Sequence, residues 1–214
     1  MPHATGAALD ALVARVSSAA MGSRFLLGIA GSPGSGKTSL ATALVDRLNA
    51  RAEGSAVHLP MDGFHLANST LDRLGIRGRK GAIDTFDGWG FVALLDRVRG
   101  ETDHTVYAPS FRRTVDEGVA GEIAIEPSAR VVVVEGNYLL AEQDPWIRVA
   151  DRLDVAWFCA TPVEERERRL IERHTRHGRS VEAATAFARD VDGANARLIE
   201  PTARRAELVV SGVT

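Results

Sequence analysis

The sequence predicts an α/β fold with a five-stranded parallel sheet and helices on both of its faces. Five short apolar runs, several of them β-branched and bounded by Gly, Asp or Pro, are typical of buried strands; they cover residues 24–31, 55–62, 129–136, 151–160 and 206–212. Helical stretches alternate with these runs, notably at residues 36–52, 88–100 and 161–178. Strands that alternate with helices form a parallel sheet covered on both sides, which gives the predicted fold class.

The segment before the first predicted strand is expected to form a short amphipathic helix. Its apolar residues recur at helical spacing, at Leu9, Leu12, Val13 and Val16. The segment lacks the basic start and the unbroken apolar core of a signal peptide. No run in the chain approaches the roughly 20 apolar residues of a membrane span, so no membrane partner is expected.

The size and charge of the chain predict one domain over residues 1–214 with a small-molecule partner. With 214 residues, of which 45% are apolar, the chain is large enough for a full core. Its net charge of −2 gives none of the basic excess that accompanies nucleic-acid binding. The one cysteine, Cys159, follows an apolar run and is expected to be a buried thiol, which fits a reducing, cytoplasmic location.

Residues 31–38, GSPGSGKT, match the phosphate-binding pattern G-x-x-x-x-G-K-[ST]. The match stands between a predicted strand and a predicted helix, which is the context that the mechanism requires. Glycines let successive N–H groups point inward and let phosphate oxygens approach, while the helix N-terminus adds partial positive charge. We therefore predict a P-loop NTPase fold, with a nucleotide bound by Gly31, Ser32, Pro33, Gly34, Ser35, Gly36, Lys37, Thr38 and Ser39.

Lys37 and Thr38 have distinct expected roles at this loop. Lys37 is expected to reach the β and γ phosphates, and the Thr38 hydroxyl to bind the magnesium ion that neutralises them. A turn that merely needs glycine would not explain a lysine and a threonine directly after Gly36. A guanine-nucleotide switch would carry an Asn-Lys-x-Asp element after a late strand, and this sequence has none. The expected cofactors are therefore ATP and Mg²⁺.

Two acidic residues follow predicted strands, at the sheet edge where ligands bind in parallel sheets. Asp62 stands in MDGFH, residues 61–65, and a carboxylate there can take the hydroxyl proton in phosphoryl transfer to an alcohol. Taken alone, an Asp-Gly pair is more often a turn. Glu135 ends the run VVVVE, where P-loop proteins hold an acid that orders magnesium; an ordinary strand-end charge is the alternative.

Further segments occur in a characteristic order along the chain: MDGFH through Asn68, RKG and TFD within residues 79–87, EGNYLL at 135–140 and RRAELVVSG at 204–212. Together with GSPGSGKT, they resemble the P-loop small-molecule kinases that include bacterial pantothenate kinase, uridine kinase and phosphoribulokinase. The resemblance is greatest to a bacterial subgroup of nucleoside/nucleotide kinase-like or fructose-transport-system-kinase-like proteins. It implies an ATP- and Mg²⁺-dependent kinase that phosphorylates a hydroxyl of a small metabolite.

The resemblance implies roles for the residues already singled out. Asp62 corresponds to the base, Lys37 and Thr38 serve phosphate and magnesium, and Glu135 supports the metal. It also implies an acceptor-site insertion at about residues 63–90. The acceptor-binding residues would be Asp62, His65, Arg79, Lys80, Asp87, Arg113 and Tyr138.

Several of these acceptor positions have ordinary structural alternatives. His65 can equally be a hydrogen-bonded turn residue, and Asp87 can be the N-cap of the following helix. Arg79 and Lys80 stand in a polar loop, where basic residues are usually solvated. Related sequences tend to read Phe-Asp-Arg where this chain has Phe-Arg-Arg ending at Arg113, so no acid role is expected there.

Arginines on the third helical stretch predict a lid over the nucleotide. Steps of three, four and three residues along one helical stripe separate Arg166, Arg169, Arg173 and Arg176. The family has a mobile lid here, at about residues 162–180, whose arginines stabilise the transferring group. We expect Arg169 and Arg173 to act in catalysis, and Arg176 and Arg205 to bind the nucleotide. A solvated helix laced with Glu–Arg pairs is the alternative.

The expected partner is a small-molecule alcohol, which is pantothenate-like, nucleoside-like or sugar-like. The alternative function is a nucleotide-binding regulatory protein without phosphotransfer activity. Such a protein would bind ATP, but no alcohol would stimulate its turnover. Relatives are often dimers or tetramers, so a homodimer or a higher homo-oligomer is among the expectations.

Overall fold

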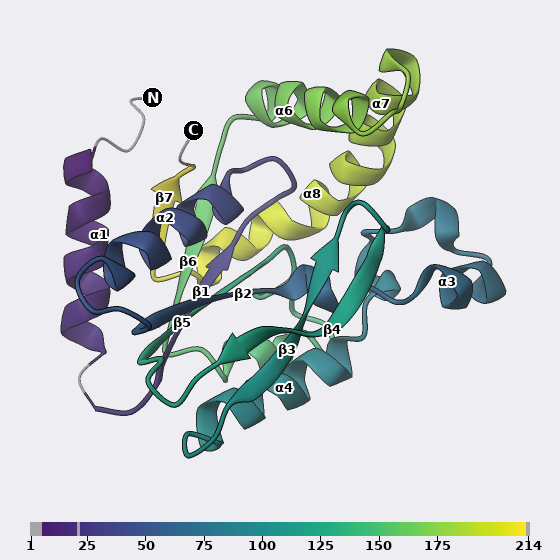
Figure 1. The fold of residues 1–214 in the computed structure, drawn as a ribbon. Coiled ribbons are helices and arrows are strands. Elements are labelled where there is room, and N and C mark those ends of the chain that lie inside the picture. Colours follow the sequence, from purple (N-terminus) through teal and green to yellow (C-terminus); the bar gives the residue numbers. More distant parts are fainter. Residues whose placement is uncertain (1–5, 21, 213–214) are drawn as a thin grey trace.

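The computed structural model describes residues 6–20 and 22–212, so the predicted domain limits of 1–214 extend beyond the described part at both ends. Its centre is a five-stranded parallel sheet with the strand order β2-β5-β1-β6-β7 (Figure 1). The strands are β1 (Phe25–Ala30), β2 (Ala56–Pro60), β5 (Val131–Gly136), β6 (Val155–Ala160) and β7 (Leu208–Ser211). The predicted parallel sheet is confirmed, and each strand lies inside its predicted segment.

Helices cover both faces of the sheet (Figure 1), and each face carries its own apolar cluster. On one face, α1 (Gly6–Ala19) and α2 (Lys37–Asn49) pack through buried residues such as Val13 and Leu44. On the other face, α4 (Gly88–Gly100) covers the sheet together with buried aromatic side chains: Phe86, Phe91, Tyr138 and Trp146. The central strands β1 and β5 are buried at every position. The helices on both faces and the amphipathic first helix are therefore confirmed.

A two-stranded antiparallel hairpin, β3 (Val106–Arg112) and β4 (Glu117–Ile125), stands outside the main sheet. The sequence analysis predicted no strands here, because most of the hairpin is exposed and its apolar pattern is weak. Its fully buried positions are Val106, Ala108 and Ile125. The hairpin packs on the turn after β2, where a Cβ added to Gly63 would stand 2.2 Å from the Pro109 carbonyl oxygen. This close approach brings the hairpin to the carboxyl edge of the sheet.

Two groups of short helices flank the same edge (Figure 1). The turn after β2 and the predicted insertion contain η1 (Met61–Phe64), α3 (Asn68–Leu74), η2 (Arg77–Arg79) and η3 (Ile83–Thr85). A loop with α5 (Ile147–Ala150) joins β5 to β6. The lid and the segment after it contain α6 (Val163–Arg176), α7 (Val181–Phe187), a π-helical turn at 188–192, α8 (Gly193–Ile199) and η5 (Glu200–Arg205). Within the described ranges, every helix is too short or too polar to cross a bilayer.

Arg24, directly before β1, ties distant segments together. Its buried guanidinium donates four hydrogen bonds of 2.8 to 3.2 Å to the backbone carbonyl oxygens of Val98, Glu101, Glu126 and Ala129. Buried carbonyl groups need such partners. This one side chain therefore satisfies the end of α4 and the turn that leads from β4 to β5.

Replacing Arg24 by alanine is expected to lower the free energy of unfolding by about 2–4 kcal/mol, because four carbonyl groups lose a charged donor. Urea unfolding followed by circular dichroism measures the change. Arg130→Ala is the matched control, since the exposed Arg130 side chain donates to one carbonyl oxygen, that of Gly22. The Arg130→Ala substitution is expected to change the free energy of unfolding by less than about 0.5 kcal/mol. Equal losses in the two variants would contradict the role given to Arg24.

Candidate active site

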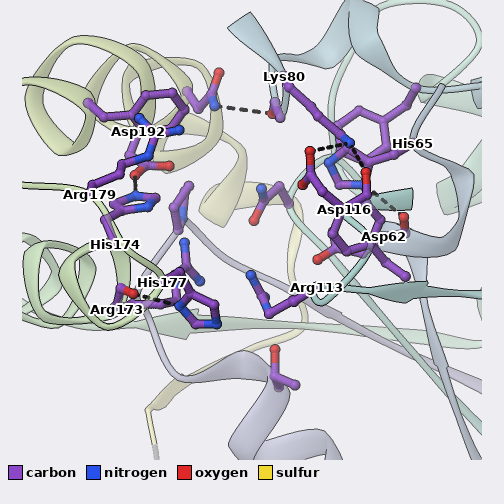
Figure 2. A pocket seen from close by; sticks show the side chains of 18 of the residues that line it. Asp62, His65, Lys80, Arg113, Asp116, Arg173, His174, His177, Arg179 and Asp192 are labelled. Atoms are coloured by element: carbon purple, nitrogen blue, oxygen red, sulfur yellow. Dashed lines mark hydrogen bonds and ion pairs between the residues drawn. The ribbon is translucent and has the colours of Figure 1, made fainter. Parts of the chain in front are cut away.

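A cavity of about 640 Å³ opens at the carboxyl edge of the parallel sheet, the edge where open parallel sheets bind ligands. Residues from the loop after β1, from the turn after β2 and the insertion, from the β3–β4 hairpin and from the lid helices line it. Figure 2 shows residues of the lid facing residues of the insertion and the hairpin: Arg173, His174, His177, Arg179 and Asp192 on one side, and Asp62, His65, Lys80 and Asp116 on the other.

The loop after β1 forms a backbone cradle at the cavity. Gly34 and Gly36 have φ angles of 78° and 92°, in the left-handed region that favours glycine. A Cβ at Gly34 would also stand 2.8 Å from the Arg166 carbonyl oxygen. Helix α2 begins at Lys37 without a side-chain cap, which leaves its first N–H groups available to an anion. The buried Ser35 hydroxyl likewise has no hydrogen-bond partner in the described part of the chain.

A buried polar cluster stands between α2 and β5. Lys37 Nζ lies 3.6 Å from Glu135 Oε1, and Thr38 Oγ1 donates to Glu135 Oε2 at 3.1 Å. His58, on the neighbouring strand β2, has its Nε2 3.6 Å from the same carboxylate. Burial alone would raise the pKa of Glu135, but the Lys37 ammonium, with His58 and Thr38, outweighs burial and holds this pKa below its ordinary value. Glu135 is therefore a carboxylate at neutral pH.

Asp62 and His65 lie in the turn that follows β2. The Asp62 carboxylate lines the cavity and makes no hydrogen bond or ion pair with another described residue, so it is available to accept a proton. His65 Nδ1 lies 2.7 Å from the Asp62 carbonyl oxygen. The imidazole contacts Phe86 and Phe111, with ring centroids 4.0 and 4.6 Å away. Burial lowers the pKa of His65 in spite of the nearby Asp62 charge, so the ring is neutral at pH 7.

Lys80 lines the cavity but is held by the hairpin turn. Its Nζ lies 2.6 Å from Asn68 Oδ1 and 3.0 Å from Asp116 Oδ2, and it also donates to the Asp116 backbone carbonyl. The same ammonium stands 4.9 Å from the centroid of the Phe111 ring. Asn68 adds a second connection, because its backbone N–H donates to the Glu117 carboxylate at 3.0 Å. These contacts tie the insertion to the hairpin.

Arg79 and Asp87, two further predicted acceptor residues, are not among the residues that line the cavity. Arg79 is exposed and pairs with Asp84 at 2.6 Å. The Asp87 carboxylate accepts a hydrogen bond of 2.8 Å from the Gly90 N–H and caps α4. Asp87 thus takes the capping role that the sequence left open as an alternative.

Tyr138 and Arg113 complete the predicted acceptor set. Tyr138 is fully buried behind the cavity, and its hydroxyl donates to the Gly81 carbonyl oxygen at 2.7 Å. Burial raises the pKa of Tyr138, so the phenol stays protonated. Asn195 donates to the same carbonyl oxygen at 3.2 Å, which connects the insertion to α8. Arg113, in the turn between β3 and β4, lines the cavity.

The four arginines of the predicted α6 stripe lie in different surroundings. Arg173 lines the cavity, with a buried Nε that has no hydrogen-bond partner among the described residues. Burial, followed by the nearby Arg113, lowers the pKa of Arg173. Arg166 is buried, and its guanidinium lies 3.5 Å from the Glu200 carboxylate.

Arg169 and Arg176, like Arg166, do not line the cavity. Arg169 pairs with Glu165 at 2.7 Å, and its Nη1 lies 3.4 Å from the Gly34 carbonyl oxygen, beside the phosphate loop. Arg176 is exposed and pairs with Glu172 at 2.7 Å. The four arginines therefore do not face the cavity together. Among them, Arg173 alone lines the cavity in the described part of the chain.

The predicted nucleotide-binding residues are also distributed unevenly. Pro33, Lys37 and Thr38 line the cavity directly. Ser39 is exposed on the first turn of α2. Arg205 is not part of the lining: its Nη1 donates to two backbone carbonyl oxygens in the segment after β5, at 2.6 and 3.2 Å.

The lid contributes polar residues that the sequence analysis did not assign to the site. His174 Nε2 lies 2.8 Å from Asp192 Oδ2. The Arg179 guanidinium packs on the Phe187 ring, 3.9 Å from its centroid, and His177 lines the cavity nearby. The pairing of His174 with a residue 18 positions later depends on the reversal of the chain through α7 and the π-helical turn. No local pattern in the sequence signals this contact.

Comparison with known proteins identifies relatives of this chain. The sequence profile of the Phosphoribulokinase / Uridine kinase family matches residues 26–214. A Schizosaccharomyces pombe protein with a provisional uridine kinase name is 36% identical over 71% of this chain and 66% of its own length. Escherichia coli YggC is 34% identical over 83% of this chain and 73% of its own length. Pantothenate kinase of Corynebacterium efficiens is 30% identical over 78% of this chain, which spans 56% of that enzyme.

A solved structure agrees with these sequence relationships. A Silicibacter sp. protein with the provisional name of fructose transport system kinase superimposes with a TM-score of 0.86 at 37% identity, and the match covers 94% of this chain and 98% of that chain. The family profile covers most of the chain, and the parallel sheet with its phosphate loop is the corresponding fold. The chain therefore belongs to the phosphoribulokinase/uridine kinase family of P-loop kinases.

Proposed function

We propose that this chain is an ATP- and Mg²⁺-dependent kinase that transfers the γ-phosphoryl group to a hydroxyl of a small metabolite. The observation that carries the proposal is that Asp62 lines the same cavity as Lys37, Thr38 and Glu135. A phosphate-binding loop alone would equally serve a switch or a motor. A carboxylate without an ion-pair partner in the described chain, in the same cavity, supplies what transfer to an alcohol requires.

The phosphate loop and the lid would hold the triphosphate from two sides. The N–H groups of the loop and of the first turn of α2 form an anion site, to which Lys37 adds a charge. Arg173 reaches the cavity from the lid and has no ion-pair partner in the described chain, so its positive charge is available to the transferring group. Charge developing on that group would be stabilised by donors that are already in position.

The residues present fit a magnesium ion. Thr38 Oγ1 and Glu135 Oε2, 3.1 Å apart, form a pair of hard oxygen atoms, the donor type that Mg²⁺ takes. Glu135 is ionised at neutral pH, so it would hold the ion directly or through a water molecule. The bound ion would supply charge neutralisation on the phosphate oxygens.

Asp62 would act as the base. It would take the proton of the acceptor hydroxyl while that oxygen bonds to the γ phosphorus, and the bond from phosphorus to the β–γ bridging oxygen would break to release ADP. His65 supports the turn that carries this carboxylate: its ring is neutral, so Nδ1 carries the proton and donates to the Asp62 carbonyl oxygen at 2.7 Å.

Gly34→Ala is expected to weaken ADP binding by at least about tenfold, because the added Cβ would push the phosphate loop away from the Arg166 carbonyl oxygen 2.8 Å away. Titration calorimetry with ADP and Mg²⁺ measures the affinity. Gly54→Ala is the matched control: Gly54 also has a positive φ, of 68°, but its nearest neighbour would be a side-chain oxygen at 3.7 Å, far from the cavity. An unchanged affinity in Gly34→Ala would count against the loop as the phosphate site.

Asp62→Asn is expected to reduce turnover by about 100-fold or more while leaving ADP affinity within about twofold, because only the base is lost. ADP release in the presence of ATP, Mg²⁺ and an alcohol acceptor measures turnover. Asp84→Asn is the control, since the Asp84 carboxylate pairs with the exposed Arg79 and does not line the cavity. Undiminished turnover in Asp62→Asn would remove Asp62 from this role. Binding of ATP without stimulation by any alcohol would favour a regulatory protein.

A further inference from the structure

We infer that the acceptor is a small, non-aromatic hydroxy compound that carries an anionic carboxylate or phosphate group, and that Arg113 binds this group. The inference rests on the proposed kinase function and narrows its acceptor. It excludes nucleosides, which the sequence left open. Two separate features of the cavity support the inference. Its aromatic rings already contact other side chains of the protein, and its charged residues differ in whether they have an ion-pair partner.

The aromatic rings beside Asp62 already pack on the protein's own side chains. The imidazole of His65 lies against Phe86 and Phe111, with centroid distances of 4.0 and 4.6 Å and interplanar angles of 42° and 41°. The Lys80 ammonium lies over the Phe111 ring as well, 4.9 Å from its centroid. A nucleobase is usually held by stacking on such a ring. Here the protein's own imidazole and ammonium groups already make the ring contacts that a nucleobase would make.

The third phenyl ring of the lining, Phe187, is covered in the same way. The Arg179 guanidinium lies 3.9 Å from its centroid, and the His174 ring lies edge-on at 5.0 Å. The aromatic surface of the described lining is thus engaged on both sides of the cavity. The acceptor subsite favours a compact molecule that is recognised through polar groups.

Two of the cationic side chains that line the cavity are paired with carboxylates. Outside the phosphate loop its cationic residues are Arg77, Lys80, Arg113, Arg173 and Arg179. Arg77 pairs with Asp72 at 3.0 Å, and Lys80 pairs with Asp116 at 3.0 Å. Arg113, Arg173 and Arg179 have no ion-pair partner in the described ranges. Arg173 is assigned to the transferring group and Arg179 packs on the Phe187 ring, so Arg113 is the cation that remains for the acceptor.

The acidic residues of the lining offer Arg113 no counter-charge. Asp116 is engaged with Lys80, Asp192 with His174 at 2.8 Å, and Glu135 with Lys37 at 3.6 Å. Asp62 is assigned to the acceptor hydroxyl. A neutral acceptor would leave the exposed Arg113 side chain to the solvent, whereas a carboxylate or a phosphate would supply it with a charged partner.

The position of Arg113 assigns it to the acceptor rather than to ATP. Figure 2 shows its side chain extending into the cavity from the hairpin, between the lid residues and the turn that carries Asp62. Arg173 comes from the lid that would close over ATP, and Arg113 comes from the hairpin that also supplies Phe111.

The first experiment compares pairs of acceptors in which a carboxylate replaces a hydroxymethyl group or a phosphate esterifies a hydroxyl. ADP release with ATP and Mg²⁺ is measured for glycerate against glycerol, gluconate against glucitol, pantothenate against pantothenol, and fructose 6-phosphate against fructose, with uridine alongside. At least one anionic member is expected to stimulate release, with kcat/KM at least about tenfold above that of its neutral partner. The first three pairs test a carboxylate and the fourth tests a phosphate.

The second experiment tests Arg113 with the acceptor that the panel identifies. Arg113→Gln is expected to raise KM for this acceptor by about tenfold or more and to leave KM for ATP within about twofold. Arg112→Gln is the matched control, because the neighbouring Arg112 is exposed, pairs with Glu122 and does not line the cavity. It is expected to leave both KM values within about twofold of those of the native chain.

The outcomes separate this inference from the function on which it rests. Stimulation by uridine, or by a neutral member as strongly as by its anionic partner, overturns the anionic acceptor and leaves the kinase function standing. A rise in KM for ATP rather than for the acceptor in Arg113→Gln overturns the assignment of Arg113. Absence of stimulation by every compound, with ATP bound, overturns the proposed function and this inference together.

Discussion

The buried contact between Lys37 and Glu135 is the constraint on which the site depends. It joins the first residue of α2 to the end of the central strand β5, and both side chains are about nine-tenths buried. Neither charge would be stable there alone, because an unpaired ion in a protein interior is costly. The pair therefore holds the phosphate loop against the sheet and leaves Thr38 beside the same carboxylate. Once the loop is anchored in this way, the turn after the adjacent β2 brings Asp62 to the same cavity.

The sheet could be predicted because its signals are local. Each of its five strands is a short apolar run with turn residues at its ends, and the helices between them show clear periodicity. The β3–β4 hairpin could not be predicted in this way. Most of its side chains are exposed, and what holds it in place is the close approach of Gly63 to Pro109, a contact between segments far apart in the sequence. Long-range backbone contacts of this kind leave no periodic pattern.

The residues of the candidate site also fall into those that a local motif predicts and those that only the tertiary structure brings together. The phosphate loop is one continuous motif, so its residues were evident from the sequence, and Lys37 and Thr38 line the cavity as expected. The lid and the acceptor side depend on the tertiary structure. The spacing of the lid arginines in the sequence predicted one stripe along the helix. It did not reveal that Arg166 pairs with the Glu200 carboxylate. Likewise, Lys80 and Arg113 are both basic residues near the acceptor, and only the structure shows that one is paired and the other is not.

The tie between Lys80, Asn68 and Asp116 has a consequence for how acceptor selectivity can change between relatives. The contacting residues of the insertion and the hairpin are 36 to 49 positions apart in the sequence, yet each segment satisfies polar groups of the other. If only the hairpin were replaced by that of a relative, the Lys80 ammonium would lose its Asp116 partner. If only the insertion were replaced, the Asp116 turn would lose the Lys80 cation. The two segments therefore form one exchangeable cassette, to be transplanted together, while the phosphate loop and the sheet beneath them stay as they are.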